Sequence, residues 1–219
     1  MLHANKEIWG QSIDQLFPNA GAFMELMMEY KAAVREVETK LHVLNDEYSI
    51  QYDRNPFENI KARIKTPRSI FEKLVRRGIE PTVENVEKCL TDIAGIRVIC
   101  SFPDDIYRLA EQLVSQDDIV LVQRKDYIKN PKPNGYRSLH LIVDVPIFLS
   151  GGKKYKSVEV QFRTIAMDFW ASLDHKLRYK KDIQNQDIIV AELKECADTI
   201  SDMDCRMQQI RFMIEEQGR

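Results

Sequence analysis

Apolar residues recur at steps of three and four positions near both ends of this chain. A helix brings such positions onto one face, so each stretch predicts a long amphipathic helix. The first stretch comprises Phe23, Leu26, Tyr30, Val34, Val37, Leu41 and Leu44. The second alternates steps of four and three over Ile189, Leu193, Cys196, Ile200, Met203, Met207, Ile210 and Ile214. That period is typical of a helix packed lengthwise on another, within one subunit or between subunits.

The section between these helices mixes turn signals with short apolar runs. Thr66-Pro67 and Thr82 are N-cap signals, and Gly78 is a stop signal. Helices are predicted over residues 67–77, 82–90, 104–114 and 164–179. Runs of strand length cover residues 96–100, 119–123, 139–145 and 155–163. This order predicts an α+β fold with one mixed sheet flanked by helices.

Composition places the chain among ordinary globular proteins. Its 219 residues are 44% hydrophobic and 30% charged, which suits one domain with a sizeable core. The net charge of -2 argues against binding nucleic acid through bulk positive charge, so DNA is not an expected partner. Without a signal peptide or a long apolar run, we expect a cytoplasmic protein that does not bind membranes. Three cysteines are interpreted as buried free thiols: Cys89, Cys100 and Cys196.

Two carboxylates, Asp92 and Glu159, lie at positions where packing of a hydrophobic core does not require them. The strand period points Val158 and Val160 into the core and Glu159 to the other face. Glu159 alone would equally fit a solvent-facing sheet. Asp92, however, lies where a helix gives way to a strand, and Gly95 after it permits close approach. Two carboxylates from different elements can hold Mg²⁺ when phosphate oxygens complete its ligands.

A basic stretch supplies the opposite charge. Residues 61–77 contain seven Lys or Arg and one acid, Glu72. A mixture of Arg and Lys favours phosphate recognition, although a solvated helix face is the usual alternative. Arg97 lies within an apolar strand and therefore needs an anionic partner. Tyr136 lies in a polar loop where its ring has little to pack on, so it suits stacking on a base. Neither GxxxxGK[ST] nor GxGxxG occurs, so side chains must bind the phosphates.

Six segments together carry a family resemblance, namely residues 61–65, 92–97, 126–128, 134–140, 158–164 and 167–175. Through them the chain resembles the RelA/SpoT-type alarmone synthetase domain, and among its members the stand-alone small alarmone synthetases, over roughly residues 20 to 215. The segment around Trp9 and the spacing at residues 78–82 indicate the RelP-type branch. The resemblance implies a single nucleotidyltransferase-like domain over residues 1–219. We divide it into a helical segment (1–47), a catalytic core (60–180) and a C-terminal helix (185–217).

The resemblance also implies the activity, that of a GTP pyrophosphokinase. Such enzymes transfer pyrophosphate from ATP to the ribose 3′-hydroxyl of GTP or GDP, giving (p)ppGpp, the alarmone of the stringent response, and AMP. No hydrolase domain is expected. By this likeness Asp92 and Glu159 are catalytic and hold Mg²⁺, with Glu159 accepting the 3′-hydroxyl proton. ATP is assigned to Arg63, Lys65, Lys73, Arg77, Arg97 and Lys125. GTP is assigned to Lys132, Tyr136, His140 and Gln161, with Tyr136 stacked on guanine.

Family likeness further implies a homotetramer, in which the second apolar stripe lies at a subunit interface or against the long N-terminal helix. Two other readings of the residues remain open. One is a non-catalytic module that binds RNA or nucleotides, which leaves Asp92 and Glu159 without a role. The other is a nucleotidyltransferase that transfers a nucleotidyl group, which a metal site alone cannot distinguish.

Overall fold

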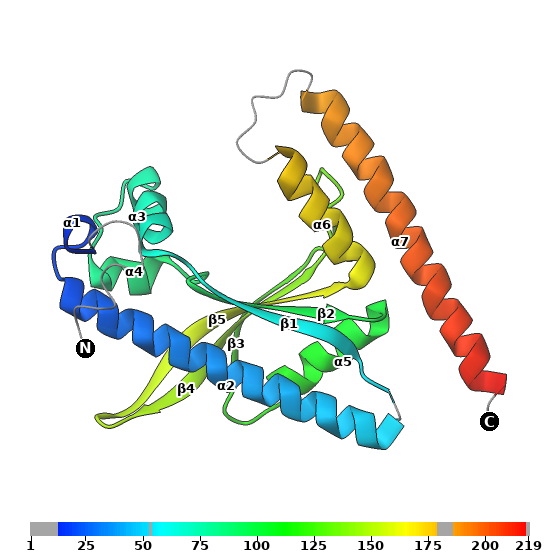
Figure 1. Cartoon of the computed structure of the whole chain (residues 1–219), viewed down its shortest axis with the longest axis horizontal. Coiled ribbons are helices and arrows are strands. Elements are labelled where there is room, and N and C mark those ends of the chain that lie inside the picture. Colours follow the sequence, from blue (N-terminus) through cyan, green and yellow to red (C-terminus); the bar gives the residue numbers. More distant parts are fainter. Residues whose placement is uncertain (1–12, 53, 179–185, 218–219) are drawn as a thin grey trace.

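Five strands form one mixed sheet in the part of the protein that the structure describes (Figure 1). The computed structural model describes residues 13–52, 54–178 and 186–217. Across the sheet the order is β1-β2-β5-β4-β3, with β2 and β5 parallel and the other neighbours antiparallel. The strands are β1 (Phe57–Ile64), β2 (Ala94–Cys100), β3 (Val120–Asp126), β4 (Leu139–Leu149) and β5 (Gly152–Thr164). The predicted α+β fold is confirmed.

Helices flank this sheet on both faces (Figure 1). They are α1 (Ile13–Leu16), α2 (Ala20–Tyr52), α3 (Pro67–Arg76), α4 (Val83–Cys89), α5 (Pro103–Val114), α6 (Ile165–Arg178) and α7 (Gln186–Gln217). The predicted caps are confirmed, because Thr66 Oγ1 accepts from the backbone N–H of Ser69 and Thr82 Oγ1 accepts from that of Asn85, each at 3.2 Å. Gly78 follows α3 with φ 67°, which ends the helix.

The long helix α2 covers one face of the sheet, and α5 packs beside it (Figure 1). Every member of the predicted apolar stripe is buried, including Val37 and Leu41 at 0% exposure. Burial of each such side chain contributes about 1.5–3 kcal/mol, which fixes α2 lengthwise on the strands. The helices α3 and α6 border the other face of the sheet.

The strand β1 was absent from the sequence prediction. Its pairing with β2 shifts register between Phe57 and Asn59, as a β-bulge does. The bulge breaks the two-residue period, so the apolar positions Phe57, Ile60 and Ile64 are spaced by three and four and imitate a helix. Beyond the bulge the strand period holds and gives Lys61 and Arg63 the same face of the sheet.

The C-terminal helix α7 packs on α6 and reaches α5, and it lies apart from α2 (Figure 1). The interpretation that its apolar stripe lies on the protein's own N-terminal helix is therefore wrong for this subunit. Most of the stripe is exposed, with Met203 at 59%, Met207 at 53% and Ile214 at 65%. Cys196 belongs to it and is exposed, and Cys89 is half-buried, so of the three predicted buried thiols only Cys100 is buried.

Two sequence expectations fall outside the described residues, namely the segment around Trp9 and the end of a helix at Tyr179. Within the described ranges, no helix combines the length and the apolar character that crossing a membrane requires.

Candidate active site

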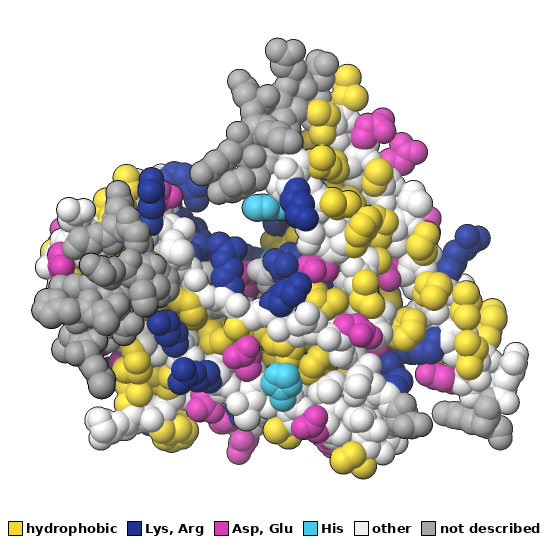
Figure 2. All heavy atoms as spheres, viewed as in Figure 1, with side chains coloured by type: hydrophobic (Ala, Val, Ile, Leu, Met, Phe, Trp, Pro, Cys, Tyr) yellow, Lys and Arg dark blue, Asp and Glu magenta, His cyan; other side chains and the backbone are white. Residues whose placement is uncertain are grey.

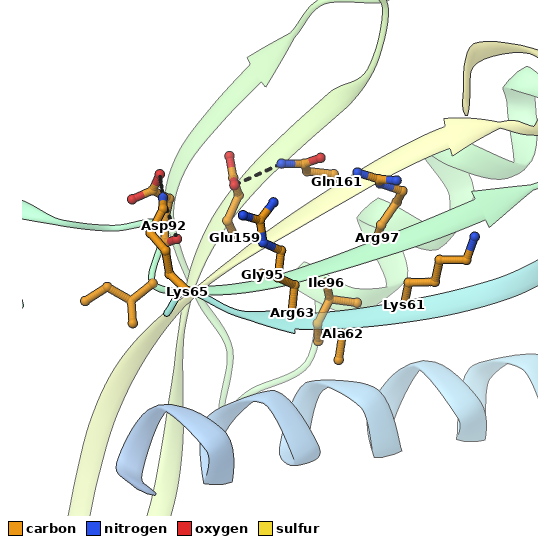
Figure 3. Close-up of a pocket in the computed structure, with 11 residues that line it drawn as sticks. Lys61, Ala62, Arg63, Lys65, Asp92, Gly95, Ile96, Arg97, Glu159 and Gln161 are labelled. Carbon is orange, nitrogen blue, oxygen red and sulfur yellow. Dashed lines mark hydrogen bonds and ion pairs between the residues drawn. The ribbon is translucent and has the colours of Figure 1, made fainter. Parts of the chain in front are cut away.

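The face of the sheet opposite α2 carries polar side chains in rows that cross the strands. Alternate residues of each strand lie on this face, and backbone pairing aligns them between strands. One row takes a residue from every strand, in the order Lys61, Arg97, Gln161, His140 and Lys125. The neighbouring row contains Arg63, Gly95 and Glu159. Figure 3 shows Arg63, Arg97, Glu159 and Gln161 extending from the sheet away from α2.

A cavity of about 490 Å³ opens over these rows at β1, β2 and β5. Figure 2 shows Lys and Arg side chains gathered around a hollow on this part of the surface. The charged groups that line the cavity are Lys61, Arg63, Lys65, Arg97, Asp92 and Glu159. Gly95 lies between Arg63 and Glu159, and a Cβ there would stand 3.8 and 3.9 Å from their backbone oxygens. Those are ordinary contact distances, so the backbones of β1 and β5 would tolerate a side chain at Gly95. The effect of the glycine is instead to leave the cavity unfilled at this position of the sheet.

Asp92 is clamped between two lysines at one end of the cavity. Its Oδ2 accepts from Lys65 Nζ and from Lys73 Nζ, each at 2.6 Å, while its Oδ1 is buried without a hydrogen-bond partner. Burial alone would raise the pKa of Asp92, but hydrogen bonds and charge from Lys65 and Lys73 outweigh it and lower that pKa. The carboxylate is therefore ionised at neutral pH, with one oxygen bonded to both lysines and the other without a hydrogen bond.

Glu159 lies mid-strand with both oxygens engaged. Oε1 lies 3.1 Å from His140 Nδ1, and Oε2 accepts from Gln161 Nε2 at 2.9 Å. Burial raises the pKa of Glu159, yet the contacts with His140 and Gln161 lower it overall, against a small opposing effect of the charge on Asp92. The carboxylate is therefore ionised and oriented at the centre of the polar face, as the strand period predicts.

Tyr136 is less isolated than its sequence context indicates. Its ring makes edge contacts with Tyr127 and His140, at centroid distances of 6.0 and 5.9 Å. The Nζ of Lys132 lies 4.7 Å from its centroid, and the guanidinium carbon of Arg163 lies 5.0 Å from it. The expectation that the ring has little to pack on is wrong, because its neighbours come from separate elements.

The hydroxyl of Tyr136 continues the line of polar contacts that begins at Glu159. A carboxylate only accepts, so the His140 Nδ1 that faces Glu159 carries a proton, and His140 Nε2 lies 2.8 Å from Tyr136 Oη. The same Oη accepts from Arg163 Nη2 at 2.6 Å. Four side chains from β4, β5 and the preceding loop are thus linked in series.

Arg163 and Asp168 extend this series, and the sequence interpretation assigned neither a role. Asp168 Oδ1 lies 3.0 Å from Arg163 Nη1 and 3.2 Å from Arg97 Nη1, so one carboxylate bridges two guanidiniums. Burial and the charge of Arg163 lower the pKa of Arg97. Asp168 is the anionic partner that a charged residue within an apolar strand requires. The signal for Arg163 was present in its alternation with Glu159 and Gln161.

A second cavity, of about 410 Å³, adjoins the first and shares Arg63 and Arg97 with it. Its other walls include Tyr136, Arg163 and five residues of α6, namely 171, 172 and 174–176. The two neighbouring cavities are cationic, and they meet at the arginines of β1 and β2. Their combined space suits two anionic ligands held side by side.

Some predicted residues lie away from the first cavity. Arg77 Nη1 donates to the backbone oxygen of Cys89 at 3.0 Å, which ties α3 to α4. Lys125 is exposed on the edge strand β3, next to His140 and at the far end of the row from Lys61. Lys132 lies over the rings of Tyr127 and Tyr136. Conversely, Lys61 lines the cavity although the sequence interpretation gave it no ligand.

A divalent cation fits the residues present. Asp92 and Glu159 line the same cavity, and the buried Oδ1 of Asp92 makes no hydrogen bond, so it keeps lone pairs that a hard cation could use. Among the described residues no group of three or more His, Cys, Asp or Glu stands at metal-binding spacing. A divalent cation held by these two carboxylates would take its remaining ligands from phosphates and water.

Comparison with known proteins agrees with this geometry. A family model described as a region found in RelA/SpoT proteins matches residues 62–184. The GTP pyrophosphokinase YwaC of Bacillus subtilis is 43% identical over 191 residues, which cover 86% of this chain and 90% of that protein.

Solved structures give the same result. The crystal structure of small alarmone synthetase 2 from Bacillus subtilis superposes with a TM-score of 0.77 at 41% identity, covering 87% of this chain and 98% of that one. Small alarmone synthetase 1 from the same organism, bound to its product pppGpp, gives a TM-score of 0.79 at 35% identity, covering 88% and 98%.

Proposed function

The chain belongs to the RelA/SpoT family, and on that premise we propose that it is a (p)ppGpp synthetase of the small alarmone synthetase kind. It transfers the pyrophosphate of ATP to the ribose 3′-hydroxyl of GTP or GDP and releases AMP. The observation that carries this proposal is the placement of two ionised carboxylates, Asp92 and Glu159, in a cationic cavity that adjoins a second cavity walled by Tyr136.

The ATP phosphates bind to the cationic wall formed by β1, β2 and α3. Lys65 and Lys73 carry long flexible stems and can exchange Asp92 for a phosphate, while Arg63 and Arg97 can fork across two oxygens. We add Lys61 to this group because it lines the same cavity. Arg77 acts indirectly, because its hydrogen bond to the backbone of Cys89 holds α3 against α4.

The guanine nucleotide binds on the side of Tyr136. The Tyr136 ring stacks on the base, and Lys132, His140 and Gln161 surround the ribose and phosphates. The position of Lys125 beside His140 favours a role on this side rather than with ATP. Along the row across the sheet, Lys61 and Arg97 thus lie on the ATP side and Gln161, His140 and Lys125 on the guanine side. Glu159 lies in the neighbouring row on β5.

The transfer is an in-line displacement at the β-phosphorus of ATP. The 3′-oxygen forms a bond to that phosphorus as the bond to the α,β-bridging oxygen breaks, and AMP leaves with the electron pair. Glu159 accepts the 3′-hydroxyl proton, which contributes roughly 10²–10⁴-fold. The remaining acceleration comes from orientation and from neutralisation of the phosphate charge by Arg63, Arg97 and the lysines.

Asp92 and Glu159 are the residues that would hold Mg²⁺. When bound, the ion supplies charge neutralisation for the transferred phosphates. The protein's own part is to keep both carboxylates ionised, which the lysines around Asp92 and the contacts of Glu159 with His140 and Gln161 achieve.

Several wider properties belong to the same proposal. The exposed apolar stripe of α7 supports assembly into a homotetramer, since such a surface is costly in a monomer. We also infer a cytoplasmic location, membership of the RelP-type branch, and a single synthetase domain. Its catalytic core is drawn from residue 57, where β1 begins, to about residue 180.

The reaction is tested by incubating the purified protein with ATP, GTP and Mg²⁺ and separating the nucleotides by chromatography. AMP together with a guanosine bearing five phosphates supports the proposal. Release of pyrophosphate would identify a nucleotidyl transfer instead, and unchanged nucleotides would indicate a binding module.

A further inference from the structure

The loop that carries Tyr136 rests directly on the C-terminal helix. Gly135, next to Tyr136, has φ 86°, a backbone conformation that favours glycine. A Cβ added to Gly135 would lie 2.5 Å from Ala197 Cβ and 3.1 Å from Lys194 Cα, both on α7. Since real Cβ atoms do not approach that closely, any side chain at this position would push the loop off the helix.

Arg137, on the other side of Tyr136, fastens the same loop to the same helix. Its Nη2 donates to Asp198 Oδ1 at 2.9 Å, and its Nη1 donates to the backbone oxygen of Ala197 at 3.3 Å. Nη1 also donates to the oxygen of Gly135 at 3.1 Å, which braces the turn. The Arg137 side chain is only 14% exposed, whereas Asp198 is 44% exposed, so the contact is buried at its loop end and open to solvent at its helix end.

The loop's internal hydrogen bonds fix its shape but not its place. The backbone N–H of Gly135 donates to the oxygen of Lys132 at 2.8 Å, and that of Lys132 donates to the oxygen of Tyr136 at 3.2 Å. Contacts outside the turn set its place. On one side Tyr136 Oη contacts His140 and Arg163, and Asn134 Nδ2 donates to Asp174 Oδ2 of α6 at 3.5 Å. On the other side the turn is supported by α7.

Helix α7 is itself firmly attached to the fold at three levels. Trp170 Nε1 donates to the oxygen of Leu193 at 2.9 Å, and Thr164 Oγ1 donates to the buried Asp204. Further along, Arg211 Nη2 donates to Asp104 Oδ2 at 2.6 Å. The helix can thus serve as a rigid support for the loop.

We propose that α7 supports the guanine-nucleotide loop, residues 132–138. Gly135 and Arg137 are then positioning residues that hold the Tyr136 ring where the base stacks. The inference rests on the proposed function. The new element is that the contact of this loop with α7 contributes to guanine-nucleotide affinity although it touches neither nucleotide. ATP affinity depends on β1, β2 and α3 and is independent of that contact.

The test compares Arg137→Met, which keeps the bulk of the side chain, with Arg137→Lys, which restores one donor. Lys194→Met is the matched control, because it removes the other partner of Asp198 and leaves the bonds of Arg137 in place. Titration calorimetry measures GTP and ATP binding separately. For Arg137→Met we expect GTP to bind about tenfold more weakly, the scale of a lost charged hydrogen bond, with ATP binding changed by less than about twofold. Arg137→Lys should recover part of the loss, and Lys194→Met should match the wild type.

Hydrogen exchange of the backbone at residues 132–138, without nucleotides, gives a readout independent of the reaction. Exchange should quicken in Arg137→Met and stay unchanged in Lys194→Met. If Arg137→Met does not fold, Asp198→Asn at the exposed end of the same contact provides the measurement, with the same direction of change. Equal losses for GTP and ATP, or an unchanged exchange rate in the loop, would overturn the proposal. A wild-type protein that makes no (p)ppGpp would refute the proposed function, while the exchange result would still decide whether α7 holds the loop.

Discussion

Tyr136 and His140 are joined through their side chains, with Tyr136 Oη 2.8 Å from His140 Nε2. His140 in turn contacts Glu159, so the ring assigned to the guanine base is connected to the carboxylate assigned to the proton. The aromatic residue therefore acts through its hydroxyl as well as through its face.

Changing Tyr136 to Ala should weaken GTP binding by roughly 1–3 kcal/mol, the scale of one stacked base, and leave ATP binding nearly unchanged. Sequence reasoning alone predicts a mild effect for Tyr136→Phe. The structure instead gives the hydroxyl two partners, so Tyr136→Phe should lower kcat by orienting His140 and Arg163 less well. Separate titrations with GTP and ATP, together with kcat, check both variants. Equal losses for the two nucleotides in Tyr136→Ala would mean that the residue is structural.

Changing Asp92 to Asn should move the magnesium dependence of the reaction to higher concentration or abolish activity, because one of two hard anionic ligands is lost. Lys65 and Lys73 lose their counter-charge at the same time, so ATP without magnesium should bind at least as well as before. Glu72→Gln, which removes an exposed carboxylate on α3, is the control. Superimposable magnesium titrations for Asp92→Asn and the wild type would refute the ligand assignment.

Asp204 provides a prediction for the dependence of stability on pH. Burial raises the pKa of this α7 carboxyl, partly offset by its hydrogen bond with Thr164. The folded state therefore binds the proton more tightly than the unfolded state, so the carboxyl costs stability at neutral pH, and that cost disappears as pH falls through its raised pKa.

Asp204→Asn should accordingly raise the Tm at pH 7 by a few degrees and lose this advantage in acid. Asp202→Asn, at an exposed position of the same helix, should change little. Thermal unfolding followed by circular dichroism over a series of pH values makes the comparison. A Tm difference that stays constant with pH would show that the carboxyl does not titrate as described.

The exposed stripe of α7 should control assembly. Met207 and Ile214 are 53% and 65% exposed in the subunit, so changing both to Lys leaves the subunit fold intact while placing two charges in the stripe. We expect an oligomer to become a monomer, as measured by light scattering coupled to size exclusion. Ser115→Lys with Gln51→Lys adds the same charge elsewhere and should leave the mass unchanged. A wild-type protein that is monomeric at micromolar concentration would contradict the interface.

Local rules were enough to predict much of this fold and the face of the sheet on which Glu159 lies. The α2 stripe, the caps at Thr66 and Thr82, and the alternation around Glu159 depend only on neighbours in sequence, and all are confirmed. The strand β1 was missed because its bulge disguises the period. The packing of α7 could not be predicted, since Asp204 and Arg211 turn toward the fold while the apolar stripe turns away.

Contacts between segments that are distant in sequence were the second feature that could not be predicted. Arg163, one partner of Tyr136, lies 27 residues away in sequence and meets it only because β4 and β5 pair. The bridge from Asp168 to Arg97 depends in the same way on how α6 lies over β2. Residue type and spacing could therefore indicate which side chains carry chemistry, but not which of them bind one another.

The most direct test of the account is the single-turnover rate of Glu159→Gln, measured with ATP, GTP and Mg²⁺ after both substrates are shown to bind. The substitution keeps the shape of the side chain and removes its charge, so the amide oxygen can still accept from one of the two donors, His140 or Gln161, while the proton acceptor is lost. We predict near-normal binding of both nucleotides and a rate of (p)ppGpp formation lower by roughly 10²–10⁴-fold. A rate close to that of the wild type, with both nucleotides bound, would contradict the role of Glu159 as the base.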